Sequence, residues 1–163
     1  MVAKNLLDAG VETGQPVAIF ASRSIDAVAG ILGCLQVGAI FVPMDPTFAP
    51  EHLGFIAQDL PIKAVLASPT NLTTARNVFS NVSAAVLLLD EKQLIELQPI
   101  AEVTGNDPAC ILYTSGTTGQ PKGVVLPHRA IATMALSESP LSISADDVVL
   151  SAATIACDGA LAE

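Results

Sequence analysis

The chain has 163 residues, the length of one ordinary domain. Its net charge of −9 at pH 7 argues against nucleic acid and anionic membrane surfaces as ligands, because binding to either needs a basic face. Hydrophobic residues make up 51% and charged residues only 14%, a composition typical of a piece buried within a larger α/β protein. We therefore expect part of its apolar surface to need a partner.

The chain alternates between apolar runs and amphipathic segments. In chain order, the expected elements are a helix at 2–9, a strand at 17–21, a helix at 25–35, strands at 39–42 and 62–67 with a helix at 50–60 between them, a helix at 68–79, strands at 84–89, 109–113 and 123–126, and a helix at 128–136. Ser24 and Pro50 are typical of helix starts, and Gly10 of a helix end. Continuous apolar strands separated by helices predict a doubly wound, mostly parallel α/β sheet.

Two stretches are harder to assign. Residues 90–107 are more polar and are expected to form a long connection. Residues 142–153 predict a further strand, after which the chain begins to look helical. The apolar stretch 27–44 is long enough for a membrane span, but its glycines and Pro43 favour a buried helix followed by a short strand.

The cysteines and the first ten residues indicate where in the cell the protein is expected. Cys34, Cys110 and Cys157 lie far apart inside apolar runs, without the C-x-x-C spacing of a metal or redox site. We predict three buried thiols. The first ten residues hold no apolar signal sequence. Together these features predict a cytoplasmic protein without a membrane segment.

The segment YTSGTTGQPKG, residues 113–123, has the composition of a phosphate-binding loop. Glycines let successive backbone N–H groups converge on an anion. The other donors are the hydroxyls of Thr114, Ser115, Thr117 and Thr118 and the ammonium group of Lys122. Residues 108–137 contain no Asp or Glu, although the chain carries 16 of them. An acidic chain therefore keeps this segment locally basic.

Two other phosphate-binding loops do not match this segment. The Walker pattern fails because Pro121 stands where its second glycine would be, and Gly123 rather than a hydroxyl residue follows Lys122. The G-x-G-x-x-G pattern is absent, and a strand rather than a helix is expected after the loop. On composition alone, a Gly/Thr surface hairpin without a ligand is the alternative.

The loop resembles the signature loop of the adenylate-forming enzymes: nonribosomal peptide synthetase adenylation domains, acyl-CoA synthetases and luciferases. LQVGAIFVPMD, residues 35–45, is similar to the family motif L-K-A-G-x-A-Y-V-P-[IL]-D, with Gln36 and Phe41 in place of Lys and Tyr. CDGALAE, residues 157–163, resembles the F-D-x-S-x-x-E segment of amino-acid-activating members. The three motifs follow the family's order. The resemblance implies that residues 1–163 are a partial AMP-binding domain, from the early part of the family's large N-terminal domain.

The chemistry implied by this resemblance is attack of a carboxylate on the α-phosphate of ATP, giving an acyl-adenylate and pyrophosphate. Fixed N–H dipoles and a lysine would stabilise the charge that grows on the β- and γ-phosphates. The implied catalytic residue is Lys122, and the implied ATP-binding positions are Thr114, Ser115, Gly116, Thr117, Thr118, Gly119 and Lys122. Tyr113 is expected to pack beneath the loop.

Asp158 bears on the substrate. From the residues alone, it either caps the helix expected to start next or serves as a buried, paired carboxylate. The resemblance implies that it grips the α-ammonium group of an amino acid, whereas fatty-acid-activating members need no negative charge there. Two departures from the motif, Cys157 for Phe and Ala160 for Ser, affect the packing around it. The sequence does not indicate which amino acid is bound.

Other charged or polar residues have plainer interpretations. Asp45 lies in VPMDP, a turn-forming context, and is expected to form a turn or a helix entry. His128 follows Pro127 at an expected helix start, where it is expected to cap or pack rather than act as a base. Glu51 and His52 are expected on the exposed side of a short helix.

Several parts that the resemblance calls for are not in this sequence: the second half of the large domain, the magnesium-contacting acid, the ribose-binding Asp and the C-terminal lid with its lysine. Mg²⁺ is therefore expected to bind through residues outside this chain, and the isolated chain is expected to be inactive. One class of function is the ATP-binding part of an adenylating ligase, with the remainder of that domain and a carrier-protein domain as partners. The other is a non-catalytic remnant or interaction module. A piece of an acyl-CoA synthetase is a further alternative.

Overall fold

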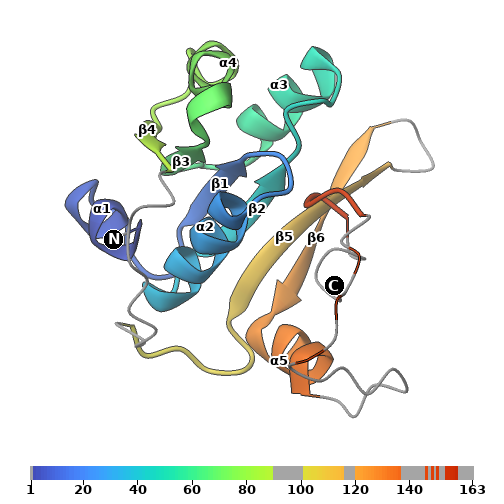
Figure 1. Ribbon diagram of the computed structural model, residues 1–163. Coiled ribbons are helices and arrows are strands. Elements are labelled where there is room, and N and C mark those ends of the chain that lie inside the picture. Colours follow the sequence, from blue (N-terminus) through green and yellow to red (C-terminus); the bar gives the residue numbers. More distant parts are fainter. Residues whose placement is uncertain are drawn as a thin grey trace.

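The computed structural model describes residues 2–89, 101–115, 120–136, 146, 148, 150 and 153–157. The described residues form helices α1 (Val2–Asp8), α2 (Ile25–Gln36), α3 (Pro50–Asp59), α4 (Leu72–Val78) and α5 (His128–Leu136), with a 3₁₀ turn, η1, at Pro69–Asn71. Their strands are β1 (Pro16–Phe20), β2 (Ile40–Met44), β3 (Ala64–Ala67), β4 (Ala85–Leu88), β5 (Pro108–Ser115) and β6 (Pro121–Pro127). Figure 1 shows this arrangement. The strand expected at 142–153 lies mostly outside the described residues.

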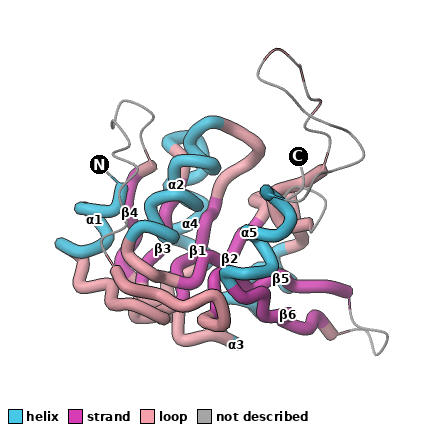
Figure 2. Tube along the Cα trace, turned by 90° about the horizontal axis from the view of Figure 1, so that it is seen from below, coloured by secondary structure: helices cyan, strands magenta, loops and turns pink. Residues whose placement is uncertain are grey.

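The strands form one six-stranded sheet in the order β4-β3-β1-β2-β5-β6. Strands β1 to β5 are paired in parallel, and β6 is antiparallel to β5. Figure 2 shows β5 and β6 side by side, at the far end of the sheet from β4. The predicted mostly parallel α/β sheet is therefore confirmed. The apolar stretch 27–44 divides into α2 and β2, as expected.

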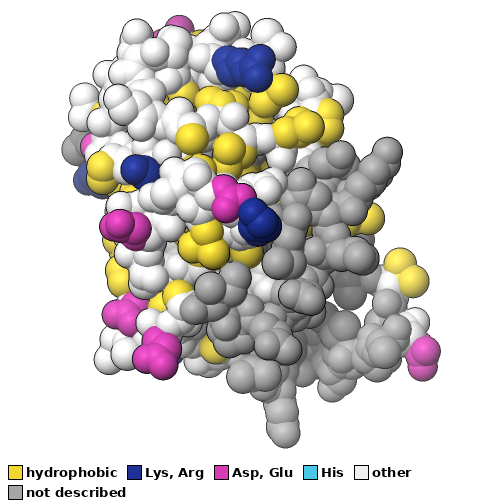
Figure 3. Space-filling view, turned by 90° about the vertical axis from the view of Figure 1, so that its left-hand side faces the viewer, with side chains coloured by type: hydrophobic (Ala, Val, Ile, Leu, Met, Phe, Trp, Pro, Cys, Tyr) yellow, Lys and Arg dark blue, Asp and Glu magenta, His cyan; other side chains and the backbone are white. Residues whose placement is uncertain are grey.

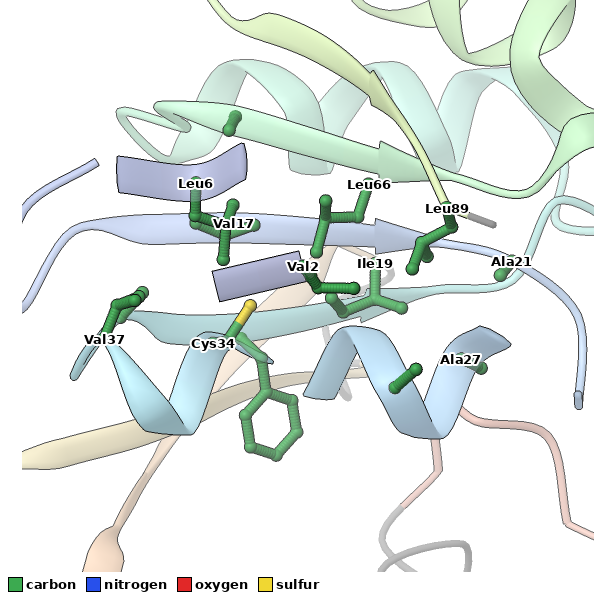
Figure 4. Close-up of a cluster of buried hydrophobic side chains, with 14 of the residues drawn as sticks. Val2, Leu6, Val17, Ile19, Ala21, Ala27, Cys34, Val37, Leu66 and Leu89 are labelled. Atoms are coloured by element: carbon green, nitrogen blue, oxygen red, sulfur yellow. The ribbon is translucent and has the colours of Figure 1, made fainter. Parts of the chain in front are cut away.

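Helices α1 and α2 cover one face of the sheet. Figure 4 shows Val2 and Leu6 of α1 and Cys34 of α2 beside Val17 and Ile19 of β1, all in one buried cluster. The two helices approach closely, since a Cβ atom placed on residue 33 would lie only 2.5 Å from the Cγ1 atom of Val2. Glycine at that position is therefore required by the α1–α2 contact.

Helices α3 and α4 cover the opposite face. The buried stripe of α3 consists of Leu53, Ile56 and Ala57. Phe20 of β1 packs edge-to-face on Phe79 at the end of α4, with ring centroids 6.2 Å apart. Helices on both faces of the sheet make the fold doubly wound, as the continuous apolar strands predicted.

The helix ends follow local sequence signals. The side chain of Ser24 accepts a hydrogen bond of 3.2 Å from the Ala27 amide and caps α2, as predicted. Pro50 is the first residue of α3. Gly10, two residues beyond α1, has φ +74°, the left-handed conformation that glycine adopts at helix ends.

Strand β6 ends the sheet and is largely exposed. Val124 and Val125 are 44% and 54% exposed, and neighbouring residues of a strand point to opposite faces. Apolar surface is therefore exposed on both faces of this strand. This agrees with the sequence composition, whose apolar fraction is high for a domain that folds alone. No helix in the described part of the chain has the length and apolarity that a membrane crossing needs. On the face shown in Figure 3, acidic and basic side chains of the described residues lie scattered among apolar ones.

Two of the sequence expectations on burial are wrong in part. Cys34 and Cys110 are buried, and burial raises the pKa of both thiols, but Cys157 is exposed. Its position at the end of a short turn, rather than inside an apolar element, accounts for the difference. Glu51 is exposed as expected, whereas His52 is half-buried with its ring edge-to-face on Phe48 at 5.0 Å.

Candidate functional site

The phosphate-loop motif is held at both ends by an antiparallel ladder. Across β5 and β6, Tyr113 pairs with Gly123, Thr114 with Lys122, and Ser115 with Pro121. The sequence placed the strand ends at 113 and 123, so the ladder runs two residues further into the motif on each side. Threonine, serine and proline are also common in turns, which concealed this extension. The connection between the strands is therefore short, residues 116–120.

Thr114 and Lys122 are brought together by this ladder. Directly opposed residues of an antiparallel pair project from the same face of the sheet. Both residues are exposed. A hydroxyl donor and an ammonium group therefore stand side by side, at the end of β5 where the motif leaves the sheet. This donor set fits phosphate oxygens.

Five of the predicted site positions are not placed. Gly116, Thr117, Thr118, Gly119 and Asp158 lie outside the described residues, so their assigned roles remain predictions. Ser115 belongs to β5 through its backbone. Among the described residues, no three His, Cys, Asp or Glu side chains gather closely enough to hold a metal ion.

Tyr113 anchors the base of the hairpin. Its side chain is only 8% exposed, and its hydroxyl donates a 2.6 Å hydrogen bond to Oδ2 of Asp59, the last residue of α3. Burial raises the pKa of Tyr113, and the hydrogen bond and negative charge of Asp59 raise it further. A Cβ atom at Gly123 would lie 3.4 Å from Cζ of Tyr113, so the ring lies against the β6 backbone. The prediction that Tyr113 packs rather than binds ligand agrees with these contacts.

Removing the Tyr113 hydroxyl should weaken this anchor. We expect Tyr113→Phe to lower the free energy of unfolding by about 1 kcal/mol, the usual net value of one hydrogen bond, because the exposed Asp59 carboxylate regains water. Urea denaturation would measure the loss. Asp59→Ala should cost a similar amount, and the double variant little more than either single one. Fully additive losses would show that the two side chains act independently.

Asp45 lies at the same edge of the sheet. Strands β2 and β5 are neighbours, with Phe41 aligned to Cys110. Carried forward four residues along both strands, this register places Asp45 level with Thr114. Beyond the carboxyl end of β2, Asp45 accepts hydrogen bonds from the amide and the hydroxyl of Thr47, at 2.9 and 2.7 Å. The predicted turn role of Asp45 is confirmed.

Sequence reasoning missed a second contact of this carboxylate. The hydroxyl of Thr154 donates a hydrogen bond to Oδ2 of Asp45, across 109 positions of the chain. No local pattern identifies Thr154, a single hydroxyl residue between apolar neighbours. The contact joins the motif at residues 35–45 to the residues just before the motif at 157–163.

The charge of Asp45 is stabilised where it lies. Burial alone would raise the pKa of its carboxyl, but hydrogen bonds from Thr154 and Thr47, together with the positive charge of Arg23, hold the pKa below its usual value. A lowered folded-state pKa stabilises the fold at any pH above the unfolded value of about 4. That stabilisation is lost as the pH falls through the folded-state value.

Residues 154–157 form a compact turn. The carbonyl of Thr154 accepts a 3.0 Å hydrogen bond from the Cys157 amide, and its hydroxyl accepts a 3.5 Å one from the Ala156 amide. Ile155 is buried in the core layer that contains α1 and α2. The turn is thus attached to the sheet on its apolar side by Ile155 and on its polar side by Asp45.

A separate cavity of about 340 Å³ lies elsewhere, near the amino end of β2. It is lined by Leu7, Val11, Glu12, Thr13, Val37 and Ala101. Among the described residues that line it, Glu12 is the one charged residue, and none supplies the positive charge that favours phosphate binding. The edge beside β5 and β6 is therefore the better candidate site.

Comparisons with known proteins find similar sequences and similar structures. The family model described as AMP-binding enzyme matches residues 1–163. The chain is 39% identical over 140 residues to Tyrocidine synthase 3 of Brevibacillus parabrevis, covering 83% of this chain and 2% of that protein. This chain thus spans a very small part of that relative.

Solved structures agree in fold. The N-terminal subdomain of NpsA from Klebsiella oxytoca superimposes with a TM-score of 0.79 and 26% identity, over 99% of this chain and 41% of that one. ATP-bound MatB from Rhodopseudomonas palustris gives a TM-score of 0.69 and 27% identity, over 81% of this chain and 28% of that one.

Proposed function

This chain belongs to the AMP-binding enzyme family, and we propose that it forms the phosphate-holding part of a ligase that activates a carboxylic acid as its acyl-adenylate. One observation carries the proposal: the β5–β6 ladder sets Thr114 and Lys122 side by side, exposed, where the motif leaves the sheet. The similar MatB structure is described as bound to ATP, which supports ATP as the nucleotide.

In this proposal the hairpin holds the leaving pyrophosphate. Negative charge grows on the β- and γ-phosphates as the acid attacks the α-phosphate, and donors already fixed in place stabilise it without reorganising. The proposed donors are Thr114, Ser115, Gly116, Thr117, Thr118, Gly119 and Lys122. When bound, Mg²⁺ supplies further positive charge to the phosphates through ligands that we propose lie outside this chain.

The proposed acid is an α-amino acid. Asp158 supplies the carboxylate that would pair with the substrate's α-ammonium group. The proposed partners are ATP, the amino acid, the remainder of the adenylation domain and a carrier-protein domain, all in the cytoplasm. If the enzyme instead activates acids without an amino group, as acyl-CoA synthetases do, Asp158 has only a structural role.

A substrate panel tests this proposal. In the enzyme that contains this chain, ATP–pyrophosphate exchange should occur with one or a few amino acids and much less with their des-amino analogues. Asp158→Ala should raise the KM for the amino acid about tenfold, the effect of losing about 1.4 kcal/mol of binding energy, and leave the KM for ATP unchanged.

Asp146→Ala serves as the matched control, because Asp146 is exposed in a turn. Equal use of amino acids and des-amino analogues by the unmutated enzyme would contradict the amino-acid proposal. Absence of exchange with every acid tested would favour the non-catalytic alternative.

A further inference from the structure

Asp45 joins two distant segments at the edge of the sheet that holds the proposed site. We propose that Asp45 is a positioning residue, whose carboxylate fixes the turn 154–157, which directly precedes Asp158 in the chain. This inference rests on the proposed function, because it gives Asp158 the amino-acid-binding role. Asp45 itself touches no substrate in this proposal.

The two carboxylate oxygens of Asp45 serve different segments. Oδ1 accepts both hydrogen bonds from Thr47, and Oδ2 accepts the hydrogen bond from Thr154. The two bonds to Oδ1 orient the carboxylate, and its plane then fixes the direction in which Oδ2 points. Thr47 therefore orients Oδ2, the atom that accepts the hydrogen bond from Thr154.

A turn-forming role alone does not account for this arrangement. An aspartate that closes a turn needs one oxygen for the amide two residues on, and its other oxygen normally faces water. Asp45 is only 9% exposed. Burying a carboxylate is costly unless its oxygens are hydrogen-bonded, and the Thr154 hydroxyl satisfies the oxygen that Thr47 leaves.

Hydrogen bonds within the turn connect Thr154 to Ala156 and Cys157. The same hydroxyl that donates to Asp45 accepts from the Ala156 amide, and the Thr154 carbonyl accepts from the Cys157 amide. Cys157 directly precedes Asp158 in the chain. With Ile155 buried in the core, the turn is held at two points, which fixes its direction as well as its place.

Two threonines provide a matched pair of variants. Thr154→Val and Thr47→Val each remove one hydroxyl donor from the same carboxylate, without changing side-chain size much. Only the first cuts the link to residues 154–157, since Thr47→Val leaves the amide hydrogen bond to Oδ1. Thr154→Ser restores the hydroxyl.

The experiment uses the enzyme that contains this chain. In Thr154→Val, hydrogen exchange at the amides of residues 155–157 should accelerate at least tenfold, and the KM for the amino acid should rise about tenfold with an unchanged KM for ATP. Thr154→Ser should recover both values, and Thr47→Val should stay within twofold of the unmutated enzyme in both.

Three results would overturn the inference. They are unchanged hydrogen exchange at the amides of residues 155–157 in Thr154→Val, equal rises in the KM for ATP and for the amino acid in that variant, or no recovery of hydrogen exchange and KM in Thr154→Ser. Failure of the proposed function is read separately, from equal use of amino acids and des-amino analogues by the unmutated enzyme. That result removes the binding role of Asp158, whereas the hydrogen-exchange measurement reports on the hydrogen bond between Asp45 and Thr154.

Discussion

Replacing Lys122 with alanine should lower ATP–pyrophosphate exchange by between one and two orders of magnitude in the enzyme that contains this chain. The ammonium group stands opposite Thr114 on the β5–β6 ladder, where it would meet the phosphate oxygens. Loss of one charge-assisted hydrogen bond to a group that gains charge costs about 1.5–3 kcal/mol of transition-state stabilisation. That cost corresponds to roughly a 10- to 150-fold slower reaction.

Lys63→Ala is the control for the loss of a lysine as such. Lys63 is exposed and precedes β3, which β1 and β2 separate from β5 in the sheet. Lys63→Ala should leave ATP–pyrophosphate exchange unchanged. Lys122→Arg keeps the charge and should retain more activity than Lys122→Ala. Unchanged exchange in Lys122→Ala would mean that Lys122 is only a solvated residue of the hairpin.

The second large effect is expected on stability, from Gly38→Ala. Gly38 has φ +68°, and a Cβ atom there would lie 2.9 Å from Cγ2 of Thr13 and from Cγ1 of Val103. An L-residue in this left-handed conformation costs about 1–2 kcal/mol. Overpacking against branched side chains adds about 1–3 kcal/mol. We expect the free energy of unfolding, measured in urea, to fall by about 2–5 kcal/mol.

Gly54→Ala is the matched control. Gly54 lies inside α3, and a Cβ atom placed there meets nothing within 4 Å. Because alanine favours helix more than glycine by up to about 1 kcal/mol, Gly54→Ala should leave stability unchanged or raise it. A Gly38→Ala protein as stable as the unmutated one would show that the turn before β2 relaxes to accept a side chain.

The strands and helices were predictable because their signals are local. Ser24 and Pro50 mark helix starts within one turn, and the apolar runs identify buried parallel strands without knowledge of their partners. A loop joining two strands was also predictable here, but the pairing of Thr114 with Lys122 within it was not. What the pattern could not give was the length of the ladder, because Thr114 and Ser115 suit a strand as well as a turn.

The contacts that depend on tertiary structure were not predictable. Asp45 was correctly expected in a turn, but nothing in VPMDP indicates a partner 109 positions away. The partner of Tyr113, Asp59, is also remote in sequence, 54 positions earlier at the end of α3. Cys157 has apolar neighbours in the sequence, as the two buried cysteines do, yet it is exposed because it lies at the end of a turn.

The short connection between β5 and β6 also bears on loop-closure entropy. Closing a flexible loop costs more entropy as the loop lengthens. Residues 116–120 separate β5 from β6, whereas residues 21–39 separate β1 from its parallel partner β2. The spacing of the Thr114 hydroxyl and the Lys122 ammonium is therefore encoded within about a dozen residues by a low-cost local closure. The spacing of Asp45 and Thr154, by contrast, is encoded only when most of the chain has folded.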